Sequence, residues 1–280
     1  MTIPLLPQQR LRYLCALTPW FDRTVLETLA SDAGAEADAL LASDIVLAAP
    51  GELPGYELRP SVRALYLLKL RSETPLTELT LQTQLFEHFL QRLSETAADD
   101  AQRPALEQIC FLHLARQAIL LAEYMEWETI AQRAEQVRAL GPYPPELQVH
   151  LTYYRGYVAI RMQRYQDGED TLMPLLPRPE IDGPLRAYVN LALGHRWFYQ
   201  GEYANARQFY EQALAAGRQA DAPIAQDASP VAVPDRHRCQ RFARCDATPD
   251  QQHRQCRTNH HLCRLFLCTR MAEMETDCLL

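Results

Sequence analysis

Apolar residues in the first 42 positions recur three or four residues apart, which is the spacing of one face of a helix. A first predicted helix ends before Thr18-Pro19, and a second begins after Asp22, whose side chain is suited to cap it. A third predicted helix covers about 35–42. This part of the chain is therefore expected to be helical.

The pattern then changes to two short runs typical of strands. Residues 45–47 are β-branched or apolar, and residues 56–58 form a matching run after the breaker-rich sequence PGELPG. Together they predict a small β-hairpin, and Pro60 then fits the first turn of a further helix. Residues 8–72 are thus expected to form one module of helices and a hairpin.

The remainder of the chain up to about residue 222 has only helical periodicity. A helix at about 76–93 lies in a segment, 73–103, that is expected to connect the first module to a set of helix pairs. These pairs are predicted at 104–123 with 126–139, at 146–162 with 165–174, and at 184–199 with 203–217. The predicted fold class is mainly α, with an N-terminal module, an α-solenoid over 104–222 and an irregular tail over 223–280.

An aromatic residue recurs in this region with a 38-residue period, and a small residue recurs nine positions before it. The aromatic residues are Trp127, Tyr165 and Tyr203, and the small residues are Ala118, Gly156 and Gly194. A fixed period of about 20 to 50 residues is typical of stacked supersecondary units that bury their apolar faces against one another. The period therefore predicts about three helical repeats.

The third unit, AYVNLALGHRWFYQGEYANARQFYEQAL, resembles a tetratricopeptide repeat. Gly194 and Ala206 stand where that repeat needs small residues because its two helices cross closely, while Trp197 and Tyr210 are expected to fill the space between units. The second unit keeps a glycine at 156 and an aromatic residue at 165, and the first unit keeps less of the pattern. The resemblance implies a concave groove that binds a protein or peptide.

Residues 10–72 resemble the winged-helix module of the STAND class of signalling ATPases. The resemblance rests on LRYLCALTPWFDRTVLETLA, ADALLASDIVL and YELRPSVRALYLLKL. In that family a histidine before the last helix reads the phosphate of the bound nucleotide, whereas Arg59 occupies this place here. The resemblance implies a truncated regulator that lacks the ATPase core, because the phosphate loop G-x-x-x-x-G-K-[ST] is absent.

Composition and motifs favour a cytoplasmic protein that is not an enzyme. The net charge is −7, no uninterrupted apolar run approaches a membrane span, and the N-terminus does not resemble a signal peptide. No nucleophile-elbow, zincin or dinucleotide-binding motif occurs. The adjacent acids Glu169 and Asp170 point apart on a helix, so a solvated surface is expected for both. No cofactor is predicted.

The candidate partner-binding residues lie on one face of each first helix of the second and third repeats. They are His150, Tyr153, Tyr157, Arg161, Tyr188, His195, Phe198 and Tyr199. Tyrosine and arginine are enriched among the residues that anchor interfaces. The alternative for each residue is simple packing against a neighbouring helix.

Two other functions remain open: a DNA-binding winged-helix regulator and a small-molecule sensor. Residues 1–72 carry eight acids against seven bases, whereas a helix that reads DNA is expected to be strongly basic. This balance argues against nucleic acid as a partner, and no membrane partner is predicted.

The Cys-, His- and Arg-rich tail does not continue the repeat pattern. Zinc is unlikely there because no C-x-x-C pair occurs among Cys239, Cys245, Cys256, His260, His261, Cys263 and Cys268. A genuine disordered tail and an out-of-frame product of GC-rich coding DNA are both compatible with this composition.

Overall fold

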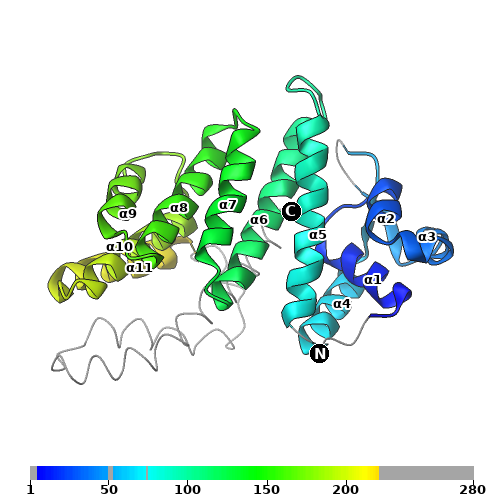
Figure 1. Ribbon diagram of the computed structural model, residues 1–280, viewed down its shortest axis with the longest axis horizontal. Helices are drawn as coiled ribbons and strands as arrows, with labels where there is room; N and C mark the ends of the chain where they lie inside the picture. Colours follow the sequence, from blue (N-terminus) through cyan, green and yellow to red (C-terminus); the bar gives the residue numbers. More distant parts are fainter. Residues whose placement is uncertain (1–4, 50–52, 74, 221–280) are drawn as a thin grey trace. The chain divides into compact units, whose positions relative to one another are not determined.

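A computed structural model describes residues 5–49, 53–73 and 75–220, and within them the protein is mainly helical, as predicted (Figure 1). The chain forms two compact units that divide between Tyr124 and Met125. The predicted tail over 223–280 lies outside the described residues. The sequence places the start of the repeats at residue 104, so the division between units falls one helix later.

Unit 1 begins with three α-helices, a hairpin and a fourth helix. The elements are α1 (Pro7–Leu17), α2 (Arg23–Leu29), the 3₁₀ turn η1 (Ser31–Ala33), α3 (Gly34–Leu41), β1 (Val46–Ala48), β2 (Tyr56–Leu58) and α4 (Pro60–Glu73). The strands are antiparallel, with Val46 opposite Leu58, so the predicted hairpin is confirmed. Asp22 accepts a hydrogen bond from the Val25 N–H at 2.9 Å, which confirms the predicted cap of α2.

Two long helices complete the core of unit 1, namely α5 (Pro75–Glu95) and α6 (Arg103–Glu123). They pack along one another, and α5 buries Leu85, Phe86, Phe89 and Leu93 completely. The segment expected to act as a connector is therefore part of a hydrophobic core. In unit 1, α6 packs against α5. The sequence predicts instead that the helix at 104–123 pairs with the one at 126–139.

A buried polar network lies between α5 and α6. His113 Nδ1 is 2.8 Å from Gln82 Oε1, and Gln117 donates to Thr83 Oγ1 at 2.7 Å. The His113 ring stacks on Phe89 with a centroid separation of 5.2 Å. Burial is the main cause of a His113 pKa well below its usual value, with further lowering by Arg116, Arg63 and His88. His113 is thus a neutral core histidine.

Among the described helices, α6 is the one long and apolar enough to cross a membrane by length and composition. More than half of its apolar stretch is buried within the structure, and the core helix of a soluble protein passes the same test. Its buried side chains include the polar residues Glu107, His113 and Gln117. This is weak evidence for a membrane span.

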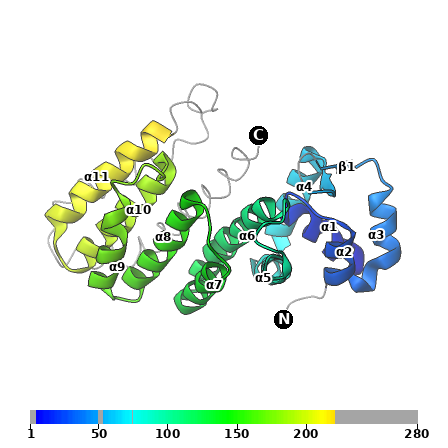
Figure 2. The ribbon, with the colours of Figure 1, turned by 90° about the horizontal axis from the view of Figure 1, so that it is seen from above.

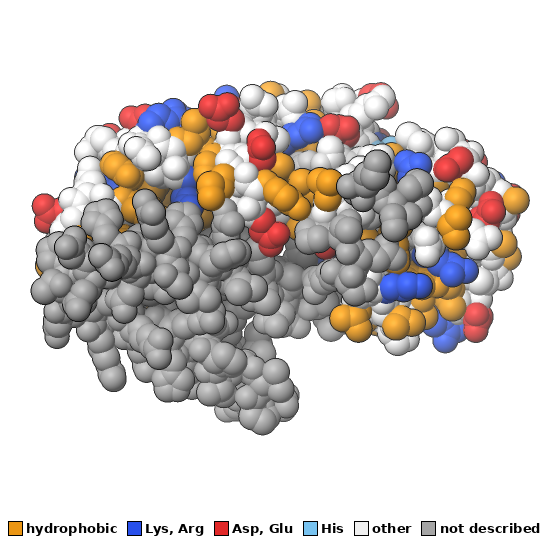
Figure 3. Space-filling view, turned by 60° about the horizontal axis from the view of Figure 1, so that its bottom comes forward, with side chains coloured by type: hydrophobic (Ala, Val, Ile, Leu, Met, Phe, Trp, Pro, Cys, Tyr) orange, Lys and Arg blue, Asp and Glu red, His pale blue; other side chains and the backbone are white. Residues whose placement is uncertain are grey.

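Unit 1 also exposes large apolar side chains. On α4, Leu65 and Leu68 are 60% and 69% exposed, respectively. Figure 3 shows hydrophobic and basic side chains next to one another at the lower right, on the part formed by this unit. The short helices of this unit do not cover all of its apolar surface.

Unit 2 contains five α-helices among its described residues (Figure 2). They are α7 (Trp127–Ala139), α8 (Pro145–Arg161), α9 (Tyr165–Leu172, followed by the 3₁₀ turn η2, Met173–Leu175), α10 (Gly183–Tyr199) and α11 (Tyr203–Ala220). Each bound lies within a few residues of the predicted one. The closest partners are α7 with α8, α8 with α9, and α10 with α11, while α10 also contacts both α8 and α9.

The turns that precede the second helices repeat at the period found in the sequence. Met125, Gln163 and Gly201 are each one period apart, and each has a positive φ, of 60°, 63° and 83°. After the last two, the backbone N–H groups of Arg164 and Glu202 donate to carbonyls five residues earlier, at 2.8 and 3.0 Å. This is the Schellman pattern, in which one left-handed residue ends a helix and reverses the chain. Each second helix therefore starts at the recurring aromatic residue.

Small residues allow the helices of each pair to cross closely. A Cβ atom on Gly156 would lie 2.5 Å from Leu172, and one on Gly194 would lie 2.4 Å from the Tyr210 ring. Leu172 and Tyr210 occupy equivalent positions, one period apart. The sequence assigns Tyr210 to the space between units, whereas its ring packs on Gly194 of its own pair, where the missing side chain leaves room for it.

Candidate functional site

The predicted partner-binding residues of unit 2 lie on the two first helices, with His150 to Arg161 on α8 and Tyr188 to Tyr199 on α10. Both helices use apolar side chains such as Val149 and Val189 to pack into the unit. The same packing places a second set of side chains, rich in tyrosine, next to one another. We call this set, with Trp127 of α7, the aromatic cluster: Trp127, Tyr153, Tyr157, Arg161, Tyr188, His195, Phe198 and Tyr199.

The first half of the aromatic cluster consists of rings from α7, α8 and α10. Tyr153 and Tyr157 stack with a centroid separation of 5.7 Å and an interplanar angle of 13°. Trp127 meets Tyr157 edge to face at 5.9 Å, and Tyr188 lies 6.3 Å from Tyr153. These separations fall in the range of favourable aromatic pairs, each worth about 0.5–1.5 kcal/mol beyond the area it buries.

The second half centres on Tyr199. Its ring lies 6.2 Å from His195, 6.1 Å from Phe198 and 6.3 Å from Tyr165, the first residue of α9. Phe198 in turn meets Tyr203, the first residue of α11, at 5.6 Å. Ring contacts therefore extend from the start of α9 to the start of α11.

Arg161 joins the two halves. Its guanidinium carbon lies 4.7 Å from the Trp127 ring centroid and 6.0 Å from that of Tyr199. Its Nη1 also donates to the Tyr199 hydroxyl at 3.0 Å. The cation is thus placed between two aromatic faces, a geometry worth about 0.5–2 kcal/mol.

Burial differs among the predicted residues. Tyr153 and His195 are buried, so neighbouring side chains cover most of their surface, whereas Tyr199 is 36% exposed. Tyr157, Arg161, Tyr188 and Phe198 are half-buried. The most accessible part of the cluster is therefore the end formed by α10.

Burial shifts the pKa values of two of the predicted residues. Desolvation raises the pKa of Tyr153 well above its usual value, and Tyr157, Tyr154 and Tyr188 add to this while Arg161 opposes it. Desolvation lowers the pKa of His150, and Asp182 opposes this shift. Both shifts favour the uncharged form of the side chain.

Sequence reasoning found Trp127, Tyr165 and Tyr203 by their period but did not assign them to the candidate site. Each begins a second helix, and the first two place their rings against the last turns of the next first helix, at Tyr157 and Arg161 and at Tyr199. The 38-residue spacing was the available signal, because it links the start of each second helix to the same position of the next unit.

A buried ion pair also lies outside the predicted set. Arg196 contacts Glu169 at 2.5 Å, and its guanidinium carbon lies 3.6 Å from the Trp197 ring centroid. The expectation of a solvated surface is wrong for Glu169, which is mostly buried by α10, and right for Asp170, which is exposed. This pair ties α9 to α10.

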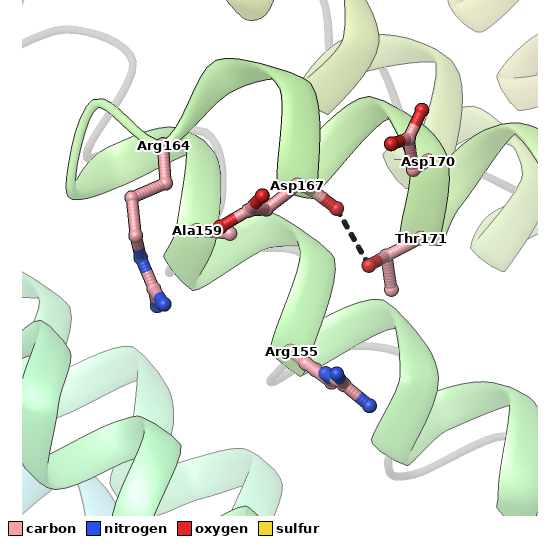
Figure 4. Close-up of a pocket in the computed structure, with 6 residues that line it drawn as sticks. All are labelled: Arg155, Ala159, Arg164, Asp167, Asp170 and Thr171. Atoms are coloured by element: carbon pink, nitrogen blue, oxygen red, sulfur yellow. Dashed lines mark hydrogen bonds between the residues drawn. The ribbon is translucent and has the colours of Figure 1, made fainter.

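A depression lies between α8 and α9 (Figure 4), and no residue of the aromatic cluster lines it. It has a volume of about 260 Å³ and is lined by Arg155, Ala159, Arg164, Asp167, Asp170 and Thr171. Figure 4 shows the hydroxyl of Thr171 bonded to the Asp167 carbonyl, an ordinary contact along one helix. Its two arginines and two aspartates balance in charge and are exposed to solvent.

The described residues contain no group of three or more metal-ligating side chains. Cys15 and Cys110 are free and buried; burial raises the pKa of the Cys110 thiol to about 12, with a further contribution from Glu107. Such thiols are unreactive. The cysteines and histidines of the tail lie outside the part of the chain that the structure describes.

Comparison with protein-family models, with curated proteins and with solved structures found no match to this chain.

Proposed function

We propose that this protein is a non-enzymatic regulatory scaffold that binds a protein or peptide segment on the aromatic cluster of unit 2. The observation that carries the proposal is the continuous ring network centred on Tyr199, together with the half-buried Arg161. Tyrosine buries a large area with few rotatable bonds, and arginine adds directed hydrogen bonds. Both are enriched in binding hot spots.

The repeated geometry of unit 2 supports a tetratricopeptide-like solenoid as its architecture. Left-handed turn residues recur every 38 positions, and close glycine contacts recur in the two pairs α8–α9 and α10–α11. In stacked helical repeats the first helices line a concave binding surface. The aromatic cluster belongs mainly to α8 and α10, which are the first helices on this assignment.

The order of elements in unit 1 supports a winged-helix-like module, similar to that of STAND-class regulators. Three helices, a hairpin and a fourth helix follow in that order. Arg59, which replaces the expected nucleotide-sensing histidine, donates from Nε to the Asp44 carbonyl. This local role fits a module that does not read a nucleotide, and we propose that the protein acts in cytoplasmic signal transduction.

The side chains of α4 favour a protein scaffold over a DNA reader. The helix exposes Leu65 and Leu68 beside the cation Lys69, and its Arg63 donates from Nε to the Ala16 carbonyl at 3.0 Å. A DNA-reading helix exposes a cluster of cations, because phosphate neutralisation supplies most of its affinity.

A peptide-array experiment with matched variants tests the proposal. The full chain is applied to immobilised random dodecapeptides, and the same arrays are probed with Tyr199→Ser and Tyr124→Ser. The two tyrosines are 36% and 45% exposed, but Tyr124 is in unit 1. Tyr199→Ser is expected to lose the binding that Tyr124→Ser keeps, since removal of a hot-spot ring costs about 2 kcal/mol or more. Equal binding by both variants would contradict the proposed surface, and parallel binding to metabolites but not peptides would favour a small-molecule sensor.

A further inference from the structure

The first helices of unit 2 carry a charge opposite to that of the chain as a whole. Together, α8 and α10 contain four arginines, Arg155, Arg161, Arg186 and Arg196, and a single acid, Glu146. The whole chain has a net charge of −7. Acidic residues are thus scarce on the two helices that contribute most of the aromatic cluster.

Two of these four arginines are held by partners outside the aromatic cluster. Arg196 is paired with Glu169, and Arg186 donates to the main-chain carbonyls of Leu176, Arg178 and Ile181. Arg155 is exposed and lines the depression between α8 and α9. Arg161 is therefore the arginine of these helices that enters the aromatic cluster.

Arg161 has no carboxylate partner among the described residues. Its contacts are the faces of Trp127 and Tyr199 and one hydrogen bond to the Tyr199 hydroxyl. A guanidinium has five N–H donors in one plane; the bond to Tyr199 uses one of them, and rings that pack on the faces leave the others at the edge available. A half-buried cation held in this way is pre-organised to donate two parallel hydrogen bonds to a planar carboxylate.

We propose that Arg161 is the subsite that recognises an aspartate or glutamate side chain in the bound peptide. This inference rests on the proposed function and specifies its ligand as an acidic segment whose carboxylate meets Arg161 while a neighbouring apolar or aromatic residue packs on Tyr199 or Phe198. Arg161 and the scarcity of acids on α8 and α10 favour such a segment, and the net negative charge of the chain disfavours acidic peptides elsewhere.

Selection of random dodecapeptides displayed on phage against the full chain tests the inference. Enriched peptides are expected to share an acidic residue at a fixed position next to an apolar or aromatic one. The best peptide is then synthesised with its acid and with the matching amide, Glu→Gln or Asp→Asn, and the dissociation constants of both are measured by calorimetry.

A double-mutant cycle locates the contact. On the natural chain, the acid-to-amide change is expected to weaken binding about tenfold to a hundredfold, the range of a charge-assisted hydrogen bond. On Arg161→Gln the same change is expected to have little effect, whereas on the control Arg155→Gln it keeps its full effect. Arg161→Lys, which retains the charge but not the two-pronged geometry, is expected to fall between these limits. Circular dichroism and melting curves establish that each variant is folded.

The outcomes separate this inference from the proposed function. Enriched peptides without a shared acid, or an acid whose replacement weakens binding equally on the natural chain and on Arg161→Gln, would overturn the assignment of Arg161 and leave the scaffold function intact. The absence of any enriched peptide would contradict both.

Discussion

The close crossing of α10 and α11 gives the sharpest test of the architecture of unit 2. A Cβ atom on Gly194 would lie 2.4 and 2.5 Å from two ring carbons of Tyr210, far inside van der Waals contact. On Gly217, in α11 of the same pair, the nearest atom would be the Ala187 Cβ at 4.0 Å. Replacement of either glycine by alanine favours the helix by up to about 1 kcal/mol, so this contribution largely cancels when the two variants are compared.

The remaining difference is the cost of overpacking. The Tyr210 ring has to shift in Gly194→Ala, and such shifts typically cost about 1–3 kcal/mol. We therefore expect Gly194→Ala to be less stable than Gly217→Ala by about 1–3 kcal/mol in urea unfolding followed by circular dichroism. In a Tyr210→Ala background the penalty at Gly194 is expected to disappear. Equal stability of the two single variants, or a penalty that persists without the ring, would refute the close crossing at Gly194.

Three further changes test the polar interior. The folded state holds His113 neutral with a lowered pKa, so only the unfolded state gains a proton below about pH 6.5. The free energy of unfolding is therefore highest above that pH and falls below it by up to about 1.4 kcal/mol per pH unit. His113→Gln should reduce this loss in urea titrations from about pH 7 to 5. Asp22→Ala removes both the α2 cap and an ion pair and should cost about 1–2 kcal/mol, whereas Asp22→Asn keeps a cap and should cost less in the same assay. Glu169→Gln leaves the buried Arg196 without its counter-ion and should cost about 3–5 kcal/mol by denaturant unfolding, against almost no change for the exposed neighbour variant Asp170→Asn.

The elements that the sequence predicts well are those whose signals are local. The Asp22 cap and the break at PGELPG each act within a few residues, and the structure confirms α2 and the hairpin. The recurring aromatic residues mark the first positions of α7, α9 and α11, because each follows a left-handed turn residue that ends the preceding helix. Local chemistry of this kind is independent of which helix becomes the neighbour in space.

Which helices pack against one another is harder to predict, because the apolar face of a helix indicates how much surface it buries and not which element covers that surface. The apolar face of α5 has the same pattern whether the helix connects two modules or completes a core, and only its contacts with α6 decide this. Glu169 shows the same limit for charge. Its sequence neighbour Asp170 is solvated, and only the position of Arg196 on another helix makes Glu169 one half of a buried pair.

The same reasoning explains why the candidate site was predicted as a list of residues but not as a connected cluster. Helical spacing places Tyr153, Tyr157 and Arg161 on one face of α8, which the sequence shows directly. Trp127 contacts Tyr157 and Arg161, and Arg161 also contacts Tyr199. The contacts of Trp127 form only because the start of one second helix lies against the end of the next first helix. Arg161 and Tyr199 occupy equivalent positions in successive units, one period apart. In one unit that position holds a ring packed on Tyr165, and in the other it holds a cation packed on Trp127. A position that packs on an aromatic ring in both of these units thus carries a charge in only one of them. On the function proposed above, this difference makes Arg161 the residue expected to distinguish one peptide from another.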